Sequence, residues 1–258
     1  MRALWSGALG FGLVNIPIQI YSATQDSDLD LEMVDKKDHS HIRFQRVNEK
    51  TGKEVPWENI AKAYEFEGET IVLDQKDFEA ASAEKTDLIE IIEFVKEEEV
   101  NSMFYEMPYY LAPQKSGVKA YFLLQKALEQ SKRSGLCTFI LRNKEHLGLI
   151  KSVGKVLVLN KIRFEEEIRQ VSDLGLPAAV EVKPNELKMA VSLIEQLSAS
   201  FDVTKYKDTY SIALMKVIKA KAKGQKTEIP KIRVSTGKTK DLMQQLQESL
   251  NAHLKKAS

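Results

Sequence analysis

The alternation of apolar and polar residues divides the chain into a β-rich first part and a helical last part. Up to about residue 183, short runs of β-branched and aliphatic residues are separated by turn-forming residues, a pattern that predicts short strands. The strands expected from these runs cover 13–21, 42–47, 70–73, 88–95, 136–141, 146–152 and 155–160. Many short strands joined by turns are typical of a sandwich or a barrel, so we expect a mainly β body that also contains helix.

Apolar residues recur at helical spacing in four places. Within the β-rich body this spacing covers 117–133, where Gly135 is expected to end the helix. Later in the chain it predicts a helix that begins at Pro184, a second over about 206–218 and a third over about 239–256. The apolar side of the last helix consists of Leu242, Leu246, Leu250 and Leu254.

Charge is distributed unevenly, although the net charge of the 258 residues is only +1. Residues 203–258 hold 13 basic and 4 acidic residues, a net of +9, which leaves 25 basic and 33 acidic residues, a net of −8, in 1–202. This asymmetry indicates a body with a basic arm that meets a polyanion. The single cysteine, Cys137, excludes a disulfide framework and a cysteine-rich zinc module, and it favours a reducing cytoplasm.

No set of residues assembles a recognisable catalytic, cofactor or metal site. The glycines of 7–12 resemble a phosphate loop, but a strand with Asn15 and Pro17 follows where a helix is needed, so we expect these glycines at close strand crossings. His39 and His41 share one face of a strand without a third ligand at a recognisable spacing. We therefore expect binding rather than catalysis, with no metal and no cofactor. No apolar run reaches the roughly 18 residues of a membrane span.

Residues 24–53 carry an ordered pattern of charge. Acidic residues 26, 28, 30 and 32 alternate with apolar residues, and the following stretch 36–53 has a net charge of +4. Its basic residues are Lys36, Lys37, Arg43, Arg46, Lys50 and Lys53. One interpretation is a solvated surface hairpin. The other is a β-ribbon that follows a phosphate backbone without reading sequence, while the acids repel DNA from the wrong side.

Several sequence blocks resemble one family. These blocks are 5–17 (WSGALGFGLVNIP), 21–24, 54–56, 108–113 (PYYLAP), 119–121, 141–147 (LRNKEHL), 201–202 and 205–208. They are similar, in order and over about residues 1–224, to bacterial Ku, the DNA-end-binding protein of non-homologous end joining. The resemblance implies a seven-stranded-type β-barrel core with a long bridge segment. It also implies an intertwined homodimer whose bridges close a ring around duplex DNA, without ATP, metal or catalytic triad.

The resemblance assigns roles to parts of the chain. Residues 1–183 would be the barrel core, with 24–66 as the bridge that encircles DNA, 184–224 a helical C-terminal arm, and 225–258 a short basic linker with a terminal amphipathic helix. The six bridge cations are then expected to contact phosphate, followed by Arg142 and Lys144 at a strand turn. The C-terminal region of the family recruits the multi-domain end-joining ligase, ligase D. That role would fall here to Tyr206, Lys207, Tyr210, Leu214, Lys216 and Lys219.

Two alternatives stay open beside the DNA-end clamp. The basic C-terminal arm would allow an architectural protein that binds DNA from the side. A lysine Schiff base would allow a lyase that acts on DNA ends, although nothing in the sequence selects one lysine. We also expect Trp5, Phe11, Tyr110 and Phe139 to be packing residues, and a protein that works in the bacterial cytoplasm at the nucleoid.

Overall fold

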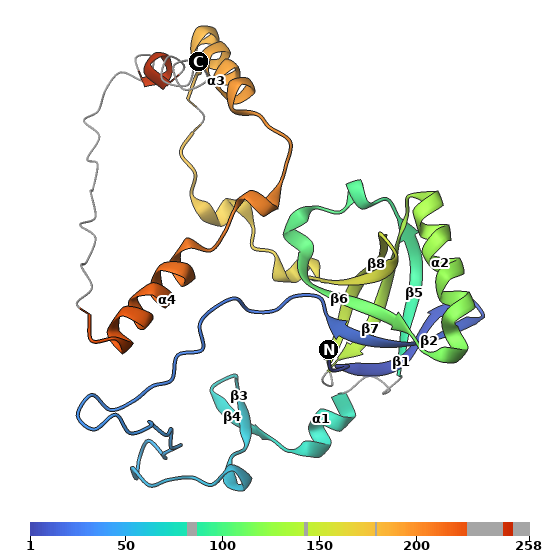
Figure 1. The fold of residues 1–258 in the computed structure, drawn as a ribbon. Helices are drawn as coiled ribbons and strands as arrows, with labels where there is room; N and C mark the ends of the chain where they lie inside the picture. Colours follow the sequence, from blue (N-terminus) through green and yellow to red (C-terminus); the bar gives the residue numbers. More distant parts are fainter. Residues whose placement is uncertain (82–86, 142–143, 179, 226–244, 250–258) are drawn as a thin grey trace. The chain divides into compact units, whose positions relative to one another are not determined.

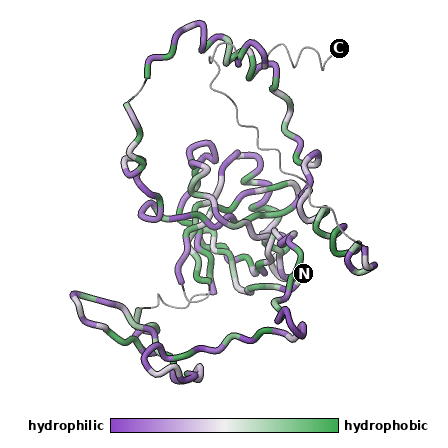
Figure 2. The backbone as a smooth tube through the Cα atoms, turned by 90° about the vertical axis from the view of Figure 1, so that its left-hand side faces the viewer, coloured by the Kyte–Doolittle hydropathy of each residue, from purple (hydrophilic) through white to green (hydrophobic). Residues whose placement is uncertain are grey.

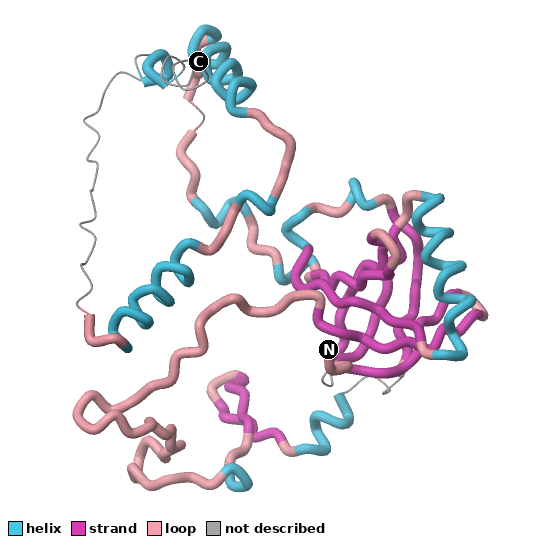
Figure 3. The backbone as a smooth tube through the Cα atoms, viewed as in Figure 1, coloured by secondary structure: helices cyan, strands magenta, loops and turns pink. Residues whose placement is uncertain are grey.

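The computed structural model describes residues 1–81, 87–141, 144–178, 180–225 and 245–249 (Figure 1). Contacts divide the chain into two compact units. The first combines Met1–Asp26 with Asp30–Asp173, and the second combines Ser27–Leu29 with Leu174–Ser258. The first unit contains all the strands of the described residues, and the second contains helices and loops (Figure 3).

A closed barrel of seven strands forms the centre of the first unit, as the β-rich pattern predicts. Its strands are β1 (Trp5–Phe11), β2 (Val14–Ser22), β5 (Leu88–Val95), β6 (Tyr105–Pro113), β7 (Ser134–Leu141), β8 (Lys144–Val153) and β9 (Val156–Ile162). Their order around the wall is β1-β2-β6-β9-β8-β7-β5. Neighbouring strands are antiparallel except at the closure, where β1 and β5 pair in parallel with Ala8 opposite Leu88.

The barrel encloses the hydrophobic core. Along β2, Ile16, Ile18 and Ile20 are fully buried and alternate with residues that face outward, as expected for a strand with one apolar face. The helix α2 (Val118–Ser131) packs Tyr121 and other apolar side chains into the same core. The Tyr121 hydroxyl donates to the Leu111 carbonyl at 2.6 Å and accepts from the Leu157 amide at 2.7 Å, so this side chain links the helix to β6 and β9.

Glycine marks a close crossing of backbone in this wall, as the sequence predicts. A Cβ at Gly7 would lie 2.4 Å from the Asp87 carbonyl oxygen, well inside contact distance. The neighbouring Ala8 amide donates to the same oxygen at 2.9 Å. The parallel closure between β1 and β5 therefore begins where only glycine leaves room for it.

Outside the barrel, the first unit has a two-stranded sheet and a short helix. The sheet consists of β3 (Lys62–Phe66) and β4 (Glu69–Leu73), and α1 (Gln75–Ala81) follows it. In the second unit, α3 (Pro184–Leu197) begins at Pro184 as predicted. The helix α4 (Thr209–Ala222) begins three residues later than expected, because Asp208 caps it by accepting from the amides of Tyr210 and Ser211.

Some sequence predictions are wrong. Residues 42–47 form no strand, and only Val47 among them makes an isolated bridge, to Glu54, because the chain turns back within a few residues on each side. Gly135 does not end a helix: α2 stops at Ser131, Lys132 takes the left-handed conformation at φ +53°, and Gly135 is buried in β7. The strands β1, β3 and β6 were not expected. The predicted terminal helix is described only over 245–249, and the rest of it lies outside the described residues.

The expected packing residues have different outcomes. Phe139 is buried, and Trp5 and Phe11 are partly buried against the core, which confirms their packing role. The prediction for Tyr110 is wrong, because its side chain lies on the outer side of β6 and is 37% exposed. Strand alternation explains the difference, since its neighbours Tyr109 and Leu111 take the two inward positions.

Candidate nucleic-acid interface

The first two bridge lysines lie on a short hairpin tip. The Ile42 amide donates to the Met33 carbonyl at 3.0 Å, and the Asp35 amide donates to the Ser40 carbonyl at 2.9 Å. Between these bonds, the carboxylate of Asp35 accepts from the Lys37 amide at 2.7 Å, a local bond typical of an aspartate that starts a turn. Residues 35–40, which we call the first tip, therefore present Lys36 and Lys37 at the end of the hairpin.

A second hairpin repeats the arrangement. The Val55 amide donates to the Arg46 carbonyl and the Asn48 amide to the Lys53 carbonyl, both at 2.8 Å. The side-chain oxygen of Asn48 accepts from the amides of Lys50 and Thr51, and Gly52 supplies the positive φ of +65° that closes the turn. Residues 48–53, the second tip, therefore present Lys50 and Lys53.

The two arginines lie between the tips. Arg46 places its guanidinium 4.6 Å from the centre of the Trp57 ring, a cation–π contact that orients the group while leaving it exposed. Arg43 is also exposed. Within the described ranges, no carboxylate lies at ion-pairing distance from any of the six bridge cations. Their charges are therefore not neutralised by a neighbouring acid.

The structure shows no link between the tips and the other two predicted phosphate contacts, Arg142 and Lys144. Lys144 is exposed at the start of β8, and no hydrogen bond or ion pair of the described residues links it to either hairpin. Arg142 lies outside the described residues. Among the acids of 24–35, Asp26, Asp28 and Asp30 are exposed, whereas the Glu32 carboxylate lies 3.2 Å from His41 Nδ1 across the first hairpin.

The segment that carries the tips exposes an unusual amount of apolar surface. No described residue from 30 to 81 is buried. Figure 2 shows hydrophobic (green) and hydrophilic (purple) stretches interspersed along the chain. Its large exposed apolar residues, all at least 41% accessible, are Leu31, Met33, Val34, Ile42, Phe44, Val47, Trp57, Ile60, Tyr64, Phe66, Ile71, Val72 and Phe78. Exposed apolar side chains in this number are typical of segments that contact a partner.

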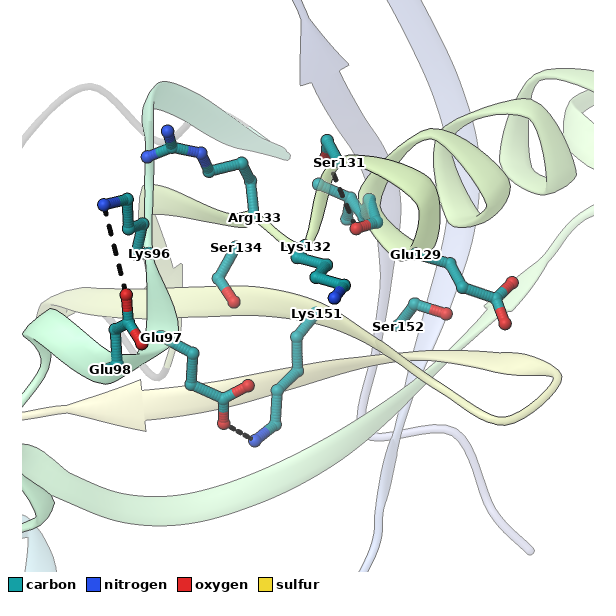
Figure 4. Close-up of a pocket in the computed structure, with 11 residues that line it drawn as sticks. Lys96, Glu97, Glu98, Glu129, Ser131, Lys132, Arg133, Ser134, Lys151 and Ser152 are labelled. Carbon is teal, nitrogen blue, oxygen red and sulfur yellow. Dashed lines mark hydrogen bonds and ion pairs between the residues drawn. The ribbon is translucent and has the colours of Figure 1, made fainter.

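A cavity of about 610 Å³ on the barrel holds a second group of cations that sequence reasoning missed (Figure 4). It lies between the ends of β5 and α2 and the strand β8, and its cations are Lys96, Lys132, Arg133 and Lys151. Glu97 pairs with Lys151, and Glu98 lies 4.0 Å from Lys96. With Glu129 also in its wall, this cavity is nearly balanced in charge, so it attracts a polyanion less than the two tips do.

Other polar groups of the barrel have structural partners. Glu106 accepts from Lys161 at 2.7 Å, a bond that lowers the pKa of its carboxyl group. Burial, then the nearby Lys161 ammonium, lowers the pKa of His146, whose ring packs 5.5 Å from Phe139. Burial raises the pKa of the Cys137 thiol, which faces the Gly148 carbonyl and does not have the properties of a nucleophile.

The described part of the chain offers neither a metal site nor a membrane-spanning helix. No group of three His, Cys, Asp or Glu side chains there is placed to hold a metal ion. None of the described helices is both long enough and apolar enough to cross a bilayer.

Comparison with known proteins identifies the family. The profile described as the Ku70/Ku80 beta-barrel domain matches residues 10–189. The chain belongs to the Ku family. The resemblance predicted from the sequence blocks is thereby confirmed, and so is the Ku-type barrel. The matched range runs from β1 to α3 and includes both tips.

Bacterial Ku proteins are similar to this chain over nearly its whole length. The relative from Opitutus terrae is 41% identical over 256 residues, which cover 97% of this chain and 92% of the relative. The relatives from Coxiella burnetii and Mycobacterium tuberculosis H37Rv are each 34% identical and cover 96% and 99% of this chain, and 94% and 97% of their own lengths. All three are named non-homologous end joining protein Ku.

Proposed function

We propose that two copies of this chain form a ring that binds the ends of broken duplex DNA without regard to sequence and recruits the ligase of non-homologous end joining, ligase D. The two lysine-bearing tips are the observation that carries the proposal. Unpaired cations at the ends of neighbouring hairpins favour contact with successive phosphates. Phosphate contacts of this kind position a protein on DNA but carry no sequence information.

The exposed apolar surface of residues 30–81 is the observation that supports a dimer of two copies. Its side chains alternate with polar ones but meet no core of their own chain. A surface patch of one copy can pack against the same patch of a second copy related by a two-fold axis. Two bridges that pack together in this way would close a ring whose inner wall carries the tips.

Preference for DNA ends then follows from topology. A closed ring can load only where the duplex terminates, so no residue needs to recognise the chemistry of the end. The net charge of +1 does not oppose this function, because the potential at the inner wall matters more than the total charge. Asp26, Asp28 and Asp30 would discourage binding from outside the ring.

The second unit supports partner recruitment. Tyr206 and Tyr210 are 77% and 72% exposed, and Lys207, Lys216 and Lys219 are exposed near them in sequence. Large exposed aromatic residues are common anchors of protein interfaces. We assign ligase docking to this region, with Leu214, which is half-buried, on the supporting side of α4. The division into core (1–183, with bridge 24–66), arm (184–224) and tail (225–258) rests on the same assignments.

The direct test compares linear DNA with covalently closed circular DNA of the same sequence in a gel-shift experiment. The ring predicts strong binding to the linear form and little to the closed circle. Equal binding to both would contradict it. Deletion of 225–258 separates the architectural alternative, because a binder that depends on the basic arm would lose most of its affinity, whereas a ring would keep its preference for ends.

We also propose that the protein has no catalytic role of its own and needs no cofactor, and that it works on DNA in the cytoplasm. The lyase alternative is tested by borohydride trapping on DNA that contains an abasic site. A covalent protein–DNA adduct at a defined lysine would overturn the non-enzymatic assignment.

A further inference from the structure

The cavity shown in Figure 4, which we call the α2–β8 cavity, lies wholly within the first unit. The chain from the end of α2 to the start of β7, residues 131–134, forms one side, and Lys151 and Ser152 of β8 form another. Its volume is about 610 Å³. Sites for small molecules usually have volumes of roughly 300–1,000 Å³, so this cavity has room for a ligand as large as a nucleotide.

Only part of the charge around the α2–β8 cavity is paired. Glu97 pairs with Lys151, and the Lys96 ammonium lies 3.8 and 4.0 Å from two neighbouring glutamates. In contrast, no carboxylate of the described residues lies within ion-pairing distance of Lys132 or Arg133. The cavity as a whole is nearly balanced in charge, but these two cations are available to a ligand.

Ser134 adds a buried hydroxyl group without a partner. The residue is 2% exposed, and its hydroxyl makes no hydrogen bond to another described residue. Figure 4 shows this hydroxyl facing the space between Lys132 and the pair of Glu97 and Lys151, whereas Glu129, the remaining acid of the wall, extends away from it. Buried polar groups in proteins are nearly always hydrogen-bonded, so the hydroxyl is free to donate to a molecule in the cavity.

The unpaired groups of the α2–β8 cavity suit a phosphate. An ammonium, a guanidinium and a hydroxyl can all donate hydrogen bonds, and a phosphate monoester offers three strongly accepting oxygens and nearly two negative charges. Guanidinium groups bind phosphate through two parallel hydrogen bonds. Phosphate alone would fill a small part of the cavity, so the site has space for an organic group attached to it.

We propose that the α2–β8 cavity binds the phosphate monoester of a small molecule of about nucleotide size, with Lys132, Arg133 and Ser134 as the phosphate ligands. The bound molecule would connect the end of α2 to the barrel wall and stabilise both. The inference goes beyond the DNA-end clamp, because the site lies on the barrel and requires neither the hairpin tips nor the dimer.

Isothermal titration calorimetry with the full chain tests the chemistry of the ligand. The probe is AMP, and adenosine, which lacks the phosphate, is the matched control, both in a buffer free of phosphate and sulfate. AMP should bind once per chain, and adenosine should bind at least about tenfold more weakly, because it makes none of the charged hydrogen bonds.

Substitutions test the three phosphate ligands. Lys132→Asn removes the ammonium but keeps a residue type that tolerates the left-handed conformation of this position. Each of Lys132→Asn, Arg133→Gln and Ser134→Ala should weaken AMP binding about tenfold or more. Lys126→Asn is the matched control, because Lys126 is an exposed lysine of α2 outside the cavity, and it should leave AMP binding unchanged.

Ser134→Ala also separates ligand binding from a structural role. Since the hydroxyl has no partner among the described residues, its removal should leave the thermal midpoint of the ligand-free chain unchanged. AMP should raise the midpoint of the parent chain and should raise that of the Ser134→Ala chain much less, because a ligand stabilises a protein in proportion to the logarithm of its saturation.

Three outcomes would overturn the inference. The first is that AMP does not bind, or binds no more tightly than adenosine. The second is that AMP binds the three variants as tightly as the parent. The third is that a 5′-phosphorylated oligonucleotide binds in a way that depends on Lys132 while AMP does not, which would assign the phosphate to the end of a DNA strand. The AMP titrations contain no DNA, so their result is independent of the linear-versus-closed DNA comparison.

Discussion

Tyr121 shows how much of the barrel's order depends on one hydroxyl group. Its hydroxyl donates a hydrogen bond to a carbonyl on β6 and accepts one from an amide on β9. The side chain is 1% exposed, so water does not reach this hydroxyl. An unpaired buried backbone group costs more than an ordinary hydrogen bond contributes, because its desolvation is no longer compensated. The residue is therefore a structural junction between the helix and the wall.

Tyr121→Phe should lower the free energy of unfolding by about 2–4 kcal/mol, because it leaves two buried backbone groups unpaired. The measurement is urea unfolding followed by fluorescence. Tyr110→Phe is the matched control, since this hydroxyl is on a side chain that is 37% exposed, and we expect a change within about 0.5 kcal/mol. Equal effects of the two changes would show that the Tyr121 hydroxyl has no special structural role.

His146 should make the stability of the barrel depend on pH. Its pKa is lowered by burial and by the Lys161 ammonium, so the unfolded chain binds the proton more readily than the folded chain. Stability is then complete above the ordinary value of 6.5 and is lost progressively as the pH falls below it. Glu106, whose pKa is also lowered, adds a further loss at more acidic pH.

His146→Gln should therefore reduce the drop in thermal midpoint between about pH 7.5 and about pH 5.5. The exposed His39, changed to Gln, is the control and should leave that drop as it is in the parent. A parent protein whose midpoint does not fall over this interval would contradict the assignment.

At the scale of elements, the two hairpin tips should act as separate and equivalent phosphate contacts. A plot of log affinity against log salt has a negative slope, and loss of each phosphate contact makes this slope less steep by about 0.9. Lys36→Ala with Lys37→Ala should therefore reduce this slope by up to roughly 3.6 in a homodimer, and Lys50→Ala with Lys53→Ala by a similar amount. Filter binding over a salt series on several DNA sequences measures both.

The control for the tips is Lys119→Ala with Lys126→Ala, a pair of exposed lysines on α2 that should leave the slope unchanged. Affinity for all sequences should fall together in the tip variants. A loss confined to particular sequences would mean that the tips contact bases rather than phosphates.

The elements also show what sequence patterns reveal and what they hide. Residues 88–95 are rich in bulky apolar residues and were expected as a strand. In contrast, β1 has two glycines and an alanine in seven residues and owes its conformation to pairing with β2 and β5. The alternation of 42–47 was misleading, because its apolar side chains face no core of this chain. The bridge cations were predicted as a group, but the place of the four lysines on two tips was not, although Asp35 and the pair Asn48 and Gly52 are turn signals.

At the scale of the whole molecule, the exposed bridge predicts a dimer. The mass in solution should be twice the 29.3 kDa of the chain. Phe44 and Phe66 are 80% and 58% exposed. Changing either residue to lysine should therefore cost little stability in the single chain but remove apolar contact area between copies. Each change should weaken dimerisation about tenfold or more, measured by light scattering over a dilution series.

The matched control for the dimer is Leu123→Lys, an equally drastic change at a 67% exposed position on α2, outside the bridge. It should leave the mass unchanged. A parent protein that stays monomeric at every concentration would remove the basis of the ring.

The parallel pairing of β1 with β5 has one more consequence. The segment between β2 and β5, about a quarter of the chain, is an insertion into the barrel. The two strands that it joins lie on either side of β1 in the barrel wall. A protease cut within this insertion breaks the polypeptide but none of the barrel's strand pairings. The two fragments should therefore copurify under native conditions and separate only in denaturant, and two separately expressed halves should be able to complement each other.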